Sequence, residues 1–161
     1  NLSPLQLNEN NFIETFMRII KESGIDPKLV ELEITEGIMM HNLEKGVIIL
    51  NKLKELGVSI ALDDFGTGYS SLSNLRKIPI DKLKIDRSFI SDYKIDQEEA
   101  IITKTIIDMG KNLGLKVLVE GAETKDQIQY LKTNGCDQVQ GYYYSKPLLF
   151  EELQEYLKKY G

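Results

Sequence analysis

Several features are scarce or absent in this 161-residue sequence, and each absence excludes a class of protein. There is one cysteine, Cys136, so no internal disulfide can form, and we expect a reduced, structural thiol. No apolar run approaches the ~18 residues that a membrane-spanning helix needs, and no signal-peptide pattern opens the chain. We therefore expect a cytoplasmic location, with any membrane anchor of the complete protein outside these residues.

Basic residues are fewer than acidic residues. The 20 lysines and arginines are outnumbered by 25 aspartates and glutamates, which gives a net charge of −5. A long nucleic acid is thus an improbable partner, because duplex binding needs a concentrated basic footprint, whereas a small anion held through metal ions remains allowed. The one histidine, His41, follows two methionines before a predicted helix and is expected in an exposed turn.

What is present indicates one globular domain. The chain is 42% hydrophobic and 28% charged, enough for a real core, and it shows no linker, low-complexity tract or internal repeat. We therefore treat residues 1–161 as one domain. Apolar periodicity and Gly or Pro boundaries predict helices over 11–23, 42–56, 71–76, 97–113, 125–133 and 150–159, and strands over 28–35, 58–62, 82–86, 116–119 and 137–140.

The order of these elements predicts an α/β fold. Strands that are apolar on both faces alternate with helices, which implies a parallel sheet, either doubly wound or closed into a barrel. Polar groups follow nearly every strand, as at the mouth of a TIM-like (β/α) barrel, whereas an open sheet gathers its ligand contacts at one switch point. If Asn1–Ser3 ends a first strand, about six of the eight βα units are present and the barrel is incomplete.

Two adjacent carboxylates, Asp63 and Asp64, end the apolar run 58–62 and precede the loop Gly66-Thr67-Gly68. One carboxylate is explained by a turn or by the cap of the next helix, but the second is not. Two carboxylates beside glycines, where backbone approaches a ligand closely, suit a divalent-metal site at a strand end. On this stretch alone, a cap and a metal site stay equally open.

The other strand ends carry further polar groups. The set is Asn1, Glu33, Asp63, Asp64, Lys84, Glu120 and Gln140. Taken singly, each has an ordinary explanation, such as a solvated acid, a snorkelling lysine or a glutamine paired with backbone. Together they form an oxygen-rich set without histidine or cysteine, which hard cations prefer, and cations would relieve the repulsion between the carboxylates.

These residues carry a family resemblance. Six short motifs, in order and over the whole chain, resemble those of the EAL domain, the cyclic di-GMP phosphodiesterase module of bacteria. They are Asn1-Leu2-Ser3, Glu33-Ile34-Thr35-Glu36, Asp63-Asp64-Phe65-Gly66-Thr67-Gly68, Lys84-Ile85-Asp86, Glu120-Gly121-Ala122-Glu123 and Gln140-Gly141. The resemblance implies a modified TIM-like barrel that hydrolyses one phosphodiester of cyclic di-GMP to linear pGpG with two Mg²⁺ or Mn²⁺ ions.

The resemblance also implies roles for single residues. Asn1, Glu33 and Asp63 would bind one metal ion, and Asp63 would bridge to a second ion bound by Asp64. Glu120 would bind that second ion or act as a base, and Lys84 and Gln140 would hold the attacking water. Glu36 would anchor the loop 65–71, which in the family carries part of a dimer contact, while Glu123 and Asp86 would support the site. The implied partners are a second copy of the chain and an upstream sensory or diguanylate cyclase domain.

One part of the family pattern does not occur in this chain. The Glu-Ala-Leu motif with its following Arg, which would complete the first metal site and contact a phosphate, is absent. For residues 1–161 alone we therefore predict weak or no phosphodiesterase activity and an exposed apolar seam that self-association would cover. Two alternatives stay open, namely a module that binds cyclic di-GMP without cleaving it and a dimerisation scaffold.

Overall fold

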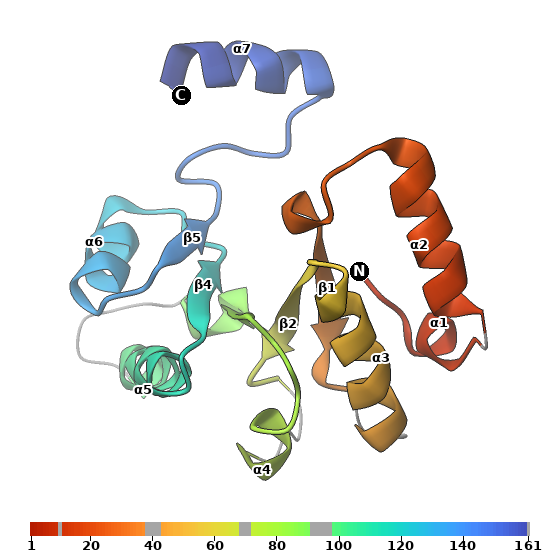
Figure 1. Ribbon diagram of the computed structural model, residues 1–161. Helices are drawn as coiled ribbons and strands as arrows, with labels where there is room; N and C mark the ends of the chain where they lie inside the picture. The colour runs from red at the N-terminus through yellow and green to blue at the C-terminus, as the bar shows by residue number, and fades with distance from the viewer. Residues whose placement is uncertain (10, 38–42, 68–71, 91–97, 161) are drawn as a thin grey trace.

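Five parallel strands form one curved sheet in a computed structural model that describes residues 1–9, 11–37, 43–67, 72–90 and 98–160 (Figure 1). The strands follow chain order across the sheet, and each pairs in parallel with the next. They are β1 (Glu31–Thr35), β2 (Ser59–Phe65), β3 (Lys82–Ile85), β4 (Lys116–Glu120) and β5 (Gln138–Gln140). Because parallel strands point the same way, their carboxyl ends meet at one edge of the sheet.

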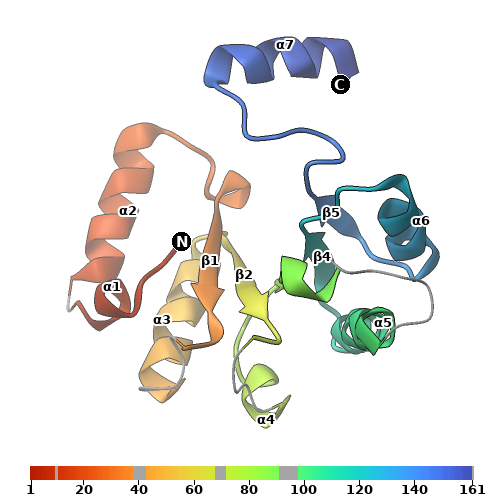
Figure 2. The ribbon, with the colours of Figure 1, turned by 180° about the vertical axis from the view of Figure 1, so that it is seen from behind.

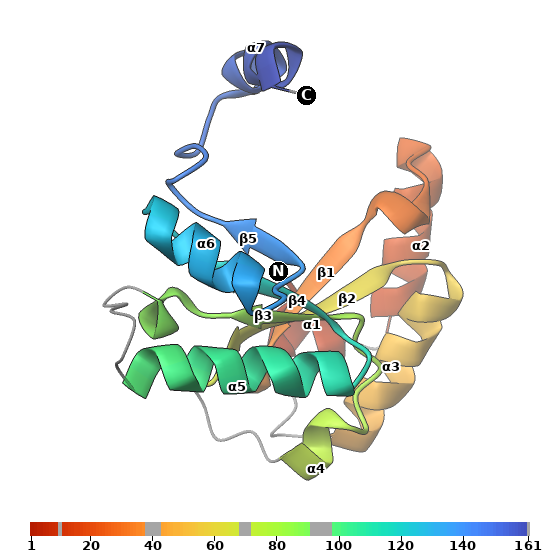
Figure 3. The same cartoon turned by 90° about the vertical axis from the view of Figure 1, so that its left-hand side faces the viewer.

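The helices lie outside the sheet, which Figure 3 shows from the side of α5 and α6, and four of them, α3 to α6, connect successive strands. The helices are α1 (Pro4–Asn8), α2 (Phe12–Ser23), α3 (Leu43–Glu55), α4 (Leu72–Leu75), α5 (Glu98–Asn112), α6 (Lys125–Thr133) and α7 (Phe150–Tyr160), with 3-10 turns η1 (Pro27–Leu29) and η3 (Arg87–Phe89). None of these described helices has the length and apolar character that crossing a bilayer requires.

The core lies between the sheet and its helices. Fully buried aliphatic side chains from the three central strands and from α3, α5 and α6 fill it, including Leu62, Leu83, Val117, Leu53 and Ile107. Strands β2 and β4 are apolar on both faces, as expected of a parallel sheet covered by helices, whereas β3 alternates Leu83 and Ile85 with Lys82 and Lys84. The sheet therefore places polar side chains at its ends, where the strands leave the core.

Local sequence explains the start of two helices and of two strands. Ser3 and Thr124 each complete a capping box, with Gln6 and Gln127 as the third residue of the helix. Asp81, just before β3, accepts the Ile60 N–H at 3.0 Å, and Asp137, just before β5, accepts the Val117 N–H at 2.9 Å. Each aspartate thus fixes the start of its strand against the preceding strand of the sheet.

The predicted first strand is wrong. Residues 1–3 are not a strand, because Ser3 caps the short helix α1, which the sequence prediction missed, and Pro4 opens that helix. The Leu2 N–H still donates to the Glu33 carbonyl at 2.8 Å, so the chain start lies beside β1. The described sheet therefore has five strands rather than six. The segment 28–30 also differs from prediction, since Pro27 starts a 3-10 turn there.

The sheet is open at both edges. Among the described residues, β1 pairs only with β2 and β5 only with β4. Helix α7 stands apart from the rest of the chain (Figures 1 and 2) and buries no residue. Its apolar side chains Phe150, Leu153 and Leu157 are exposed. An apolar surface is therefore exposed on α7, while the apolar seam expected at the edge of the sheet stays a prediction.

Candidate metal centre

Lys84, on the central strand β3, is the hub of a cluster of acidic side chains at the carboxyl edge of the sheet. Its side chain is almost fully buried. Its Nζ lies 2.5 Å from Oε1 of Glu33, 2.8 Å from Oδ1 of Asp63 and 2.9 Å from Oε1 of Glu120. These carboxylates come from β1, β2 and β4, so one lysine joins the ends of four strands.

The charges of this cluster depend on one another. Burial acts to lower the pKa of Lys84, but its contacts with Asp63, Glu33 and Glu120 outweigh burial and raise that pKa well above the usual value. Lys84 is therefore a fixed positive charge. One ammonium cannot neutralise three carboxylates, so the cluster keeps an excess of negative charge that favours further cations.

Asp63, Asp64 and Glu120 form a candidate group of metal ligands. Each offers one carboxylate oxygen, and these three atoms all lie within 4.8 Å of one another. Asp63 Oδ1 is buried, and its one close cationic neighbour among the described residues is Lys84 Nζ at 2.8 Å. A set of carboxylate oxygens without nitrogen or sulfur ligands fits Mg²⁺ or Mn²⁺. The observed donor set therefore suits the cations that the sequence predicts.

Asp64 differs from Asp63 in backbone and exposure. Its φ of 54° lies in the left-handed region, and it is the one non-glycine residue of the described chain with a positive φ. The side chain is exposed. Desolvation, followed by the charge of Asp63, raises its pKa. Successive side chains of a regular strand point to opposite faces, but the left-handed backbone of Asp64 breaks this alternation. The carboxylates of Asp63 and Asp64 therefore both lie near Glu120.

Glu36 holds the chain that follows these aspartates. It is buried, and its Oε1 accepts the Gly66 N–H at 3.0 Å. This contact agrees with the predicted anchoring of the loop after β2, although residues 68–71 of that loop lie outside the described residues. Asp86 caps η3 by accepting the Ser88 N–H at 3.0 Å, and hydrogen bonds from Ser88 lower its pKa. Glu36 and Asp86 thus each accept a hydrogen bond from backbone near the acidic cluster.

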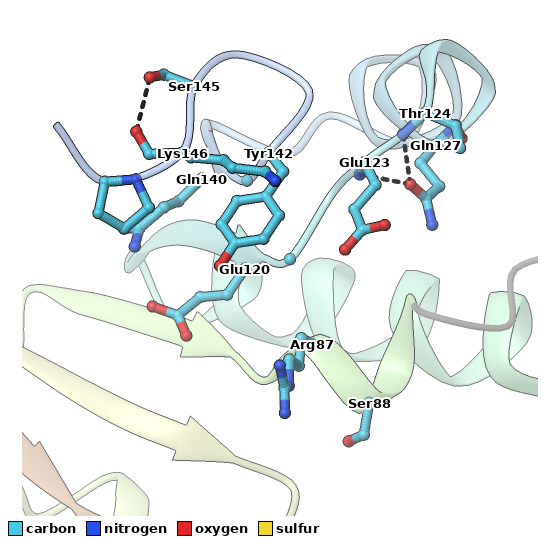
Figure 4. A pocket seen from close by; sticks show the side chains of 13 residues that line it. Arg87, Ser88, Glu120, Glu123, Thr124, Gln127, Gln140, Tyr142, Ser145 and Lys146 are labelled. Atoms are coloured by element: carbon cyan, nitrogen blue, oxygen red, sulfur yellow. Dashed lines mark hydrogen bonds between the residues drawn. The ribbon is translucent and has the colours of Figure 1, made fainter.

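A cavity of about 860 Å³ opens beside Glu120 (Figure 4). Gln140, which is paired in register with Glu120, lines it, as do Glu123, Arg87 and Lys146. Its size is that of a small-ligand site. Two cationic side chains, Arg87 and Lys146, thus face a cavity that adjoins the carboxylates.

The structure brings together most of the residues that the sequence singled out. Glu33, Asp63, Asp64, Lys84 and Glu120 form the cluster, and Gln140 and Glu123 line the adjoining cavity. Asn1 is exposed, and no described contact joins its side chain to the carboxylates. Sequence reasoning missed Arg87, Lys146 and the buried Gln127, because a charge or an amide on a loop or helix carries no periodic signal.

Fold and site together define a barrel-type α/β protein with a candidate divalent-metal centre at its strand ends. The family model described as "EAL domain" matches residues 1–147, so the chain belongs to the EAL domain family. The family membership and the TIM-like α/β fold expected from the sequence are thereby confirmed.

Relatives and solved structures agree with this assignment. The chain is 42% identical to the cyclic di-GMP phosphodiesterase NbdA of Pseudomonas aeruginosa, over 99% of this chain and 20% of NbdA. It matches the crystal structure of the EAL domain of Mycobacterium smegmatis DcpA with a TM-score of 0.91 and 40% identity, covering 99% of this chain and 71% of that one. It also matches a manganese/cyclic di-GMP complex of Klebsiella pneumoniae BlrP1, with a TM-score of 0.79, 29% identity and coverage of 88% and 36%. The chain spans about a fifth of the length of NbdA.

Proposed function

We propose that the complete protein hydrolyses cyclic di-GMP to linear pGpG with two divalent cations, Mg²⁺ or Mn²⁺, in bacterial second-messenger signalling. The observation that carries the proposal is the convergence of carboxylates from three strands on Lys84, with the ligand atoms of Asp63, Asp64 and Glu120 within 4.8 Å of one another. The names of NbdA and of the BlrP1 complex support the substrate.

The proposed metal ligands are those that the family resemblance implies, and the grouping of Asp63, Asp64 and Glu120 supports them. Glu33, Asp63 and Asn1 would hold one cation, and Asp64, Glu120 and the shared Asp63 would hold a second. Cations bound there would supply positive charge to the attacking and leaving oxygens of the phosphodiester. The positively charged Lys84 ammonium, which contacts three carboxylates, lies beside these proposed cation sites.

Lys84, Glu120 and Gln140 are the proposed catalytic side chains. Lys84 and Gln140 orient the attacking water. The Glu120 carboxylate, which lies 2.9 Å from Lys84 Nζ, accepts the proton of that water. Glu36, Glu123 and Asp86 support these groups. The cavity beside Glu120 receives the nucleotide, where the positive charges of Arg87 and Lys146 suit an anionic substrate.

The test is incubation of the complete protein with cyclic di-GMP and Mn²⁺, followed by chromatography of the products. We expect pGpG from the wild-type protein, none in the presence of EDTA, and none from Glu120→Gln, which keeps the shape of the side chain and removes its charge. Measurable binding of cyclic di-GMP without pGpG would contradict the enzyme proposal and favour the binding module.

The wider organisation of the protein is also a proposal. We expect residues 1–161 to belong to one EAL domain, and the chain covers 71% of the DcpA EAL domain structure. The much greater length of NbdA supports further sensory or diguanylate cyclase domains. A homodimer and a cytoplasmic location complete the proposal, and sedimentation of the complete protein with and without Mn²⁺ tests the dimer.

A further inference from the structure

Two glycines that follow the acidic groups lie against the same 3-10 turn, η3. Gly66 comes two residues after Asp64, and Gly121 directly follows Glu120. Both adopt the left-handed backbone, with φ of +98° and +77°. A Cβ on Gly66 would lie 2.6 Å from the ring of Phe89, and a Cβ on Gly121 would overlap Cβ of Arg87. The turn therefore fills the space between the ends of β2 and β4.

Two buried polar side chains fix this turn from the outside. Thr103 on α5 is fully buried, and its Oγ1 lies 2.6 Å from the Phe89 carbonyl and 2.8 Å from the Glu99 carbonyl of its own helix. Gln127 on α6 is 5% exposed and donates from Nε2 to the Ile90 carbonyl at 2.7 Å. Neither contact belongs to a regular helix or strand, so each is specific to the position of η3.

Gln127 also holds the segment that follows Glu120. Its Oε1 accepts the N–H groups of Glu123 at 2.7 Å and Thr124 at 2.8 Å (Figure 4). The same amide thus ties the end of η3 to the chain after β4. Because both ends of this amide are bonded, a shift of η3 must move either Gln127 or the segment 121–124.

The backbone of Asp64 needs such a support. A non-glycine residue in the left-handed region persists only where its surroundings hold it there. Gly66, two residues on, is held by the hydrogen bond to Glu36 and by the packing of Phe89. The Phe89 ring is therefore part of what keeps Asp64 turned toward Asp63 and Glu120.

We propose that η3 is a spacer that sets the separation of the β2 aspartates from Glu120, and that Thr103 and Gln127 are positioning residues that hold this spacer. They act through Phe89, Arg87 and the two glycines rather than by touching substrate. The inference rests on the proposed metal-dependent function. Outer contacts that orient metal ligands are commonly worth roughly 10- to 100-fold in metal affinity or activity.

The test compares Thr103→Val with Thr105→Val in the complete protein. Thr105 lies on the same helix, and its Oγ1 lies 2.7 Å from the carbonyl four residues earlier, much as Thr103 Oγ1 lies 2.8 Å from the Glu99 carbonyl, but Thr105 is exposed. The control therefore matches the substitution and its effect on the helix. Mn²⁺ affinity is measured by titration without substrate, and kcat and KM with cyclic di-GMP follow.

We expect Thr103→Val to weaken Mn²⁺ binding by roughly tenfold or more and to lower kcat with little change in KM, while Thr105→Val and Thr103→Ser stay near wild type. Phe89→Leu, which shortens the side chain against Gly66, should also weaken Mn²⁺ binding. Wild-type Mn²⁺ affinity in Thr103→Val or in Phe89→Leu overturns the inference. Failure of the wild-type protein itself to bind Mn²⁺ overturns the proposed function instead.

Discussion

Replacing Lys84 by methionine should destabilise the protein far more without metal than with it. The substitution keeps an unbranched side chain and removes the charge that holds Glu33, Asp63 and Glu120. Truncating one partner of a buried ion pair costs about 3–5 kcal/mol. The three carboxylate side chains are 28%, 15% and 23% exposed, so water screens part of the interaction. We expect a loss of about 2–4 kcal/mol in EDTA.

Thermal unfolding of the complete protein, followed by circular dichroism, measures this effect. For a domain of this size, 2–4 kcal/mol lowers Tm by roughly 5–15 °C. Saturating Mn²⁺ should shrink the difference, because cations replace the missing positive charge and stabilise the variant more than the wild type. Activity should be lost in either case. Lys104→Met is the control, since Lys104 forms an exposed ion pair with Asp108 within α5 and should change stability by only ~0.5 kcal/mol. Equal losses in EDTA and in Mn²⁺, or a Lys84→Met loss no larger than that of Lys104→Met, would refute the electrostatic reasoning.

Three further predictions concern neighbouring positions. Asp64→Asn should abolish activity and weaken Mn²⁺ binding while leaving Tm in EDTA nearly unchanged, because Asn tolerates the φ of 54° that Asp64 adopts. Gly66→Ala should lower the free energy of unfolding by several kcal/mol, because it adds both backbone strain and overlap with Phe89. The control Gly114→Ala, at φ +74° with open space around it, should lower that free energy by only about 1 kcal/mol. Similar Tm values for the two variants would exclude the overlap with Phe89. Asp86→Asn should lower the free energy of unfolding above about pH 4. This difference from wild type should vanish as the pH falls through the lowered pKa of Asp86, because a group with a depressed pKa stabilises the fold only while it is ionised. Urea titrations from pH 2 to 7 measure the free energy of unfolding of both proteins.

Strand and helix periodicity predicted most of the fold. The predicted range of α6, 125–133, is the observed one, and the apolar runs of β2 and β4 both form central strands, because hydrophobic pattern and capping act locally. The strand expected at residues 1–3 was wrong. The sequence indicated a polar strand end there, and the Ser3–Gln6 capping box that starts α1 instead was overlooked.

The acidic groups of the candidate site could be predicted, but not the way they are held together. Strand ends of a parallel sheet share one edge, so Glu33, Asp63 and Glu120 had to be neighbours once the fold class was recognised. The position of Lys84 Nζ among all three depends on rotamers and register that no single strand encodes. The roles of Thr103 and Gln127 depend on contacts between elements far apart in the chain, which periodicity does not report.

Crystallography of the complete protein with Mn²⁺, using the anomalous signal of manganese, tests the central claim most directly. The account predicts anomalous peaks within coordination distance, about 2.0–2.3 Å, of oxygens of Asp63, Asp64 and Glu120, with Lys84 beside them. Manganese bound elsewhere, with Asp63 and Glu120 contacting only Lys84, would contradict it.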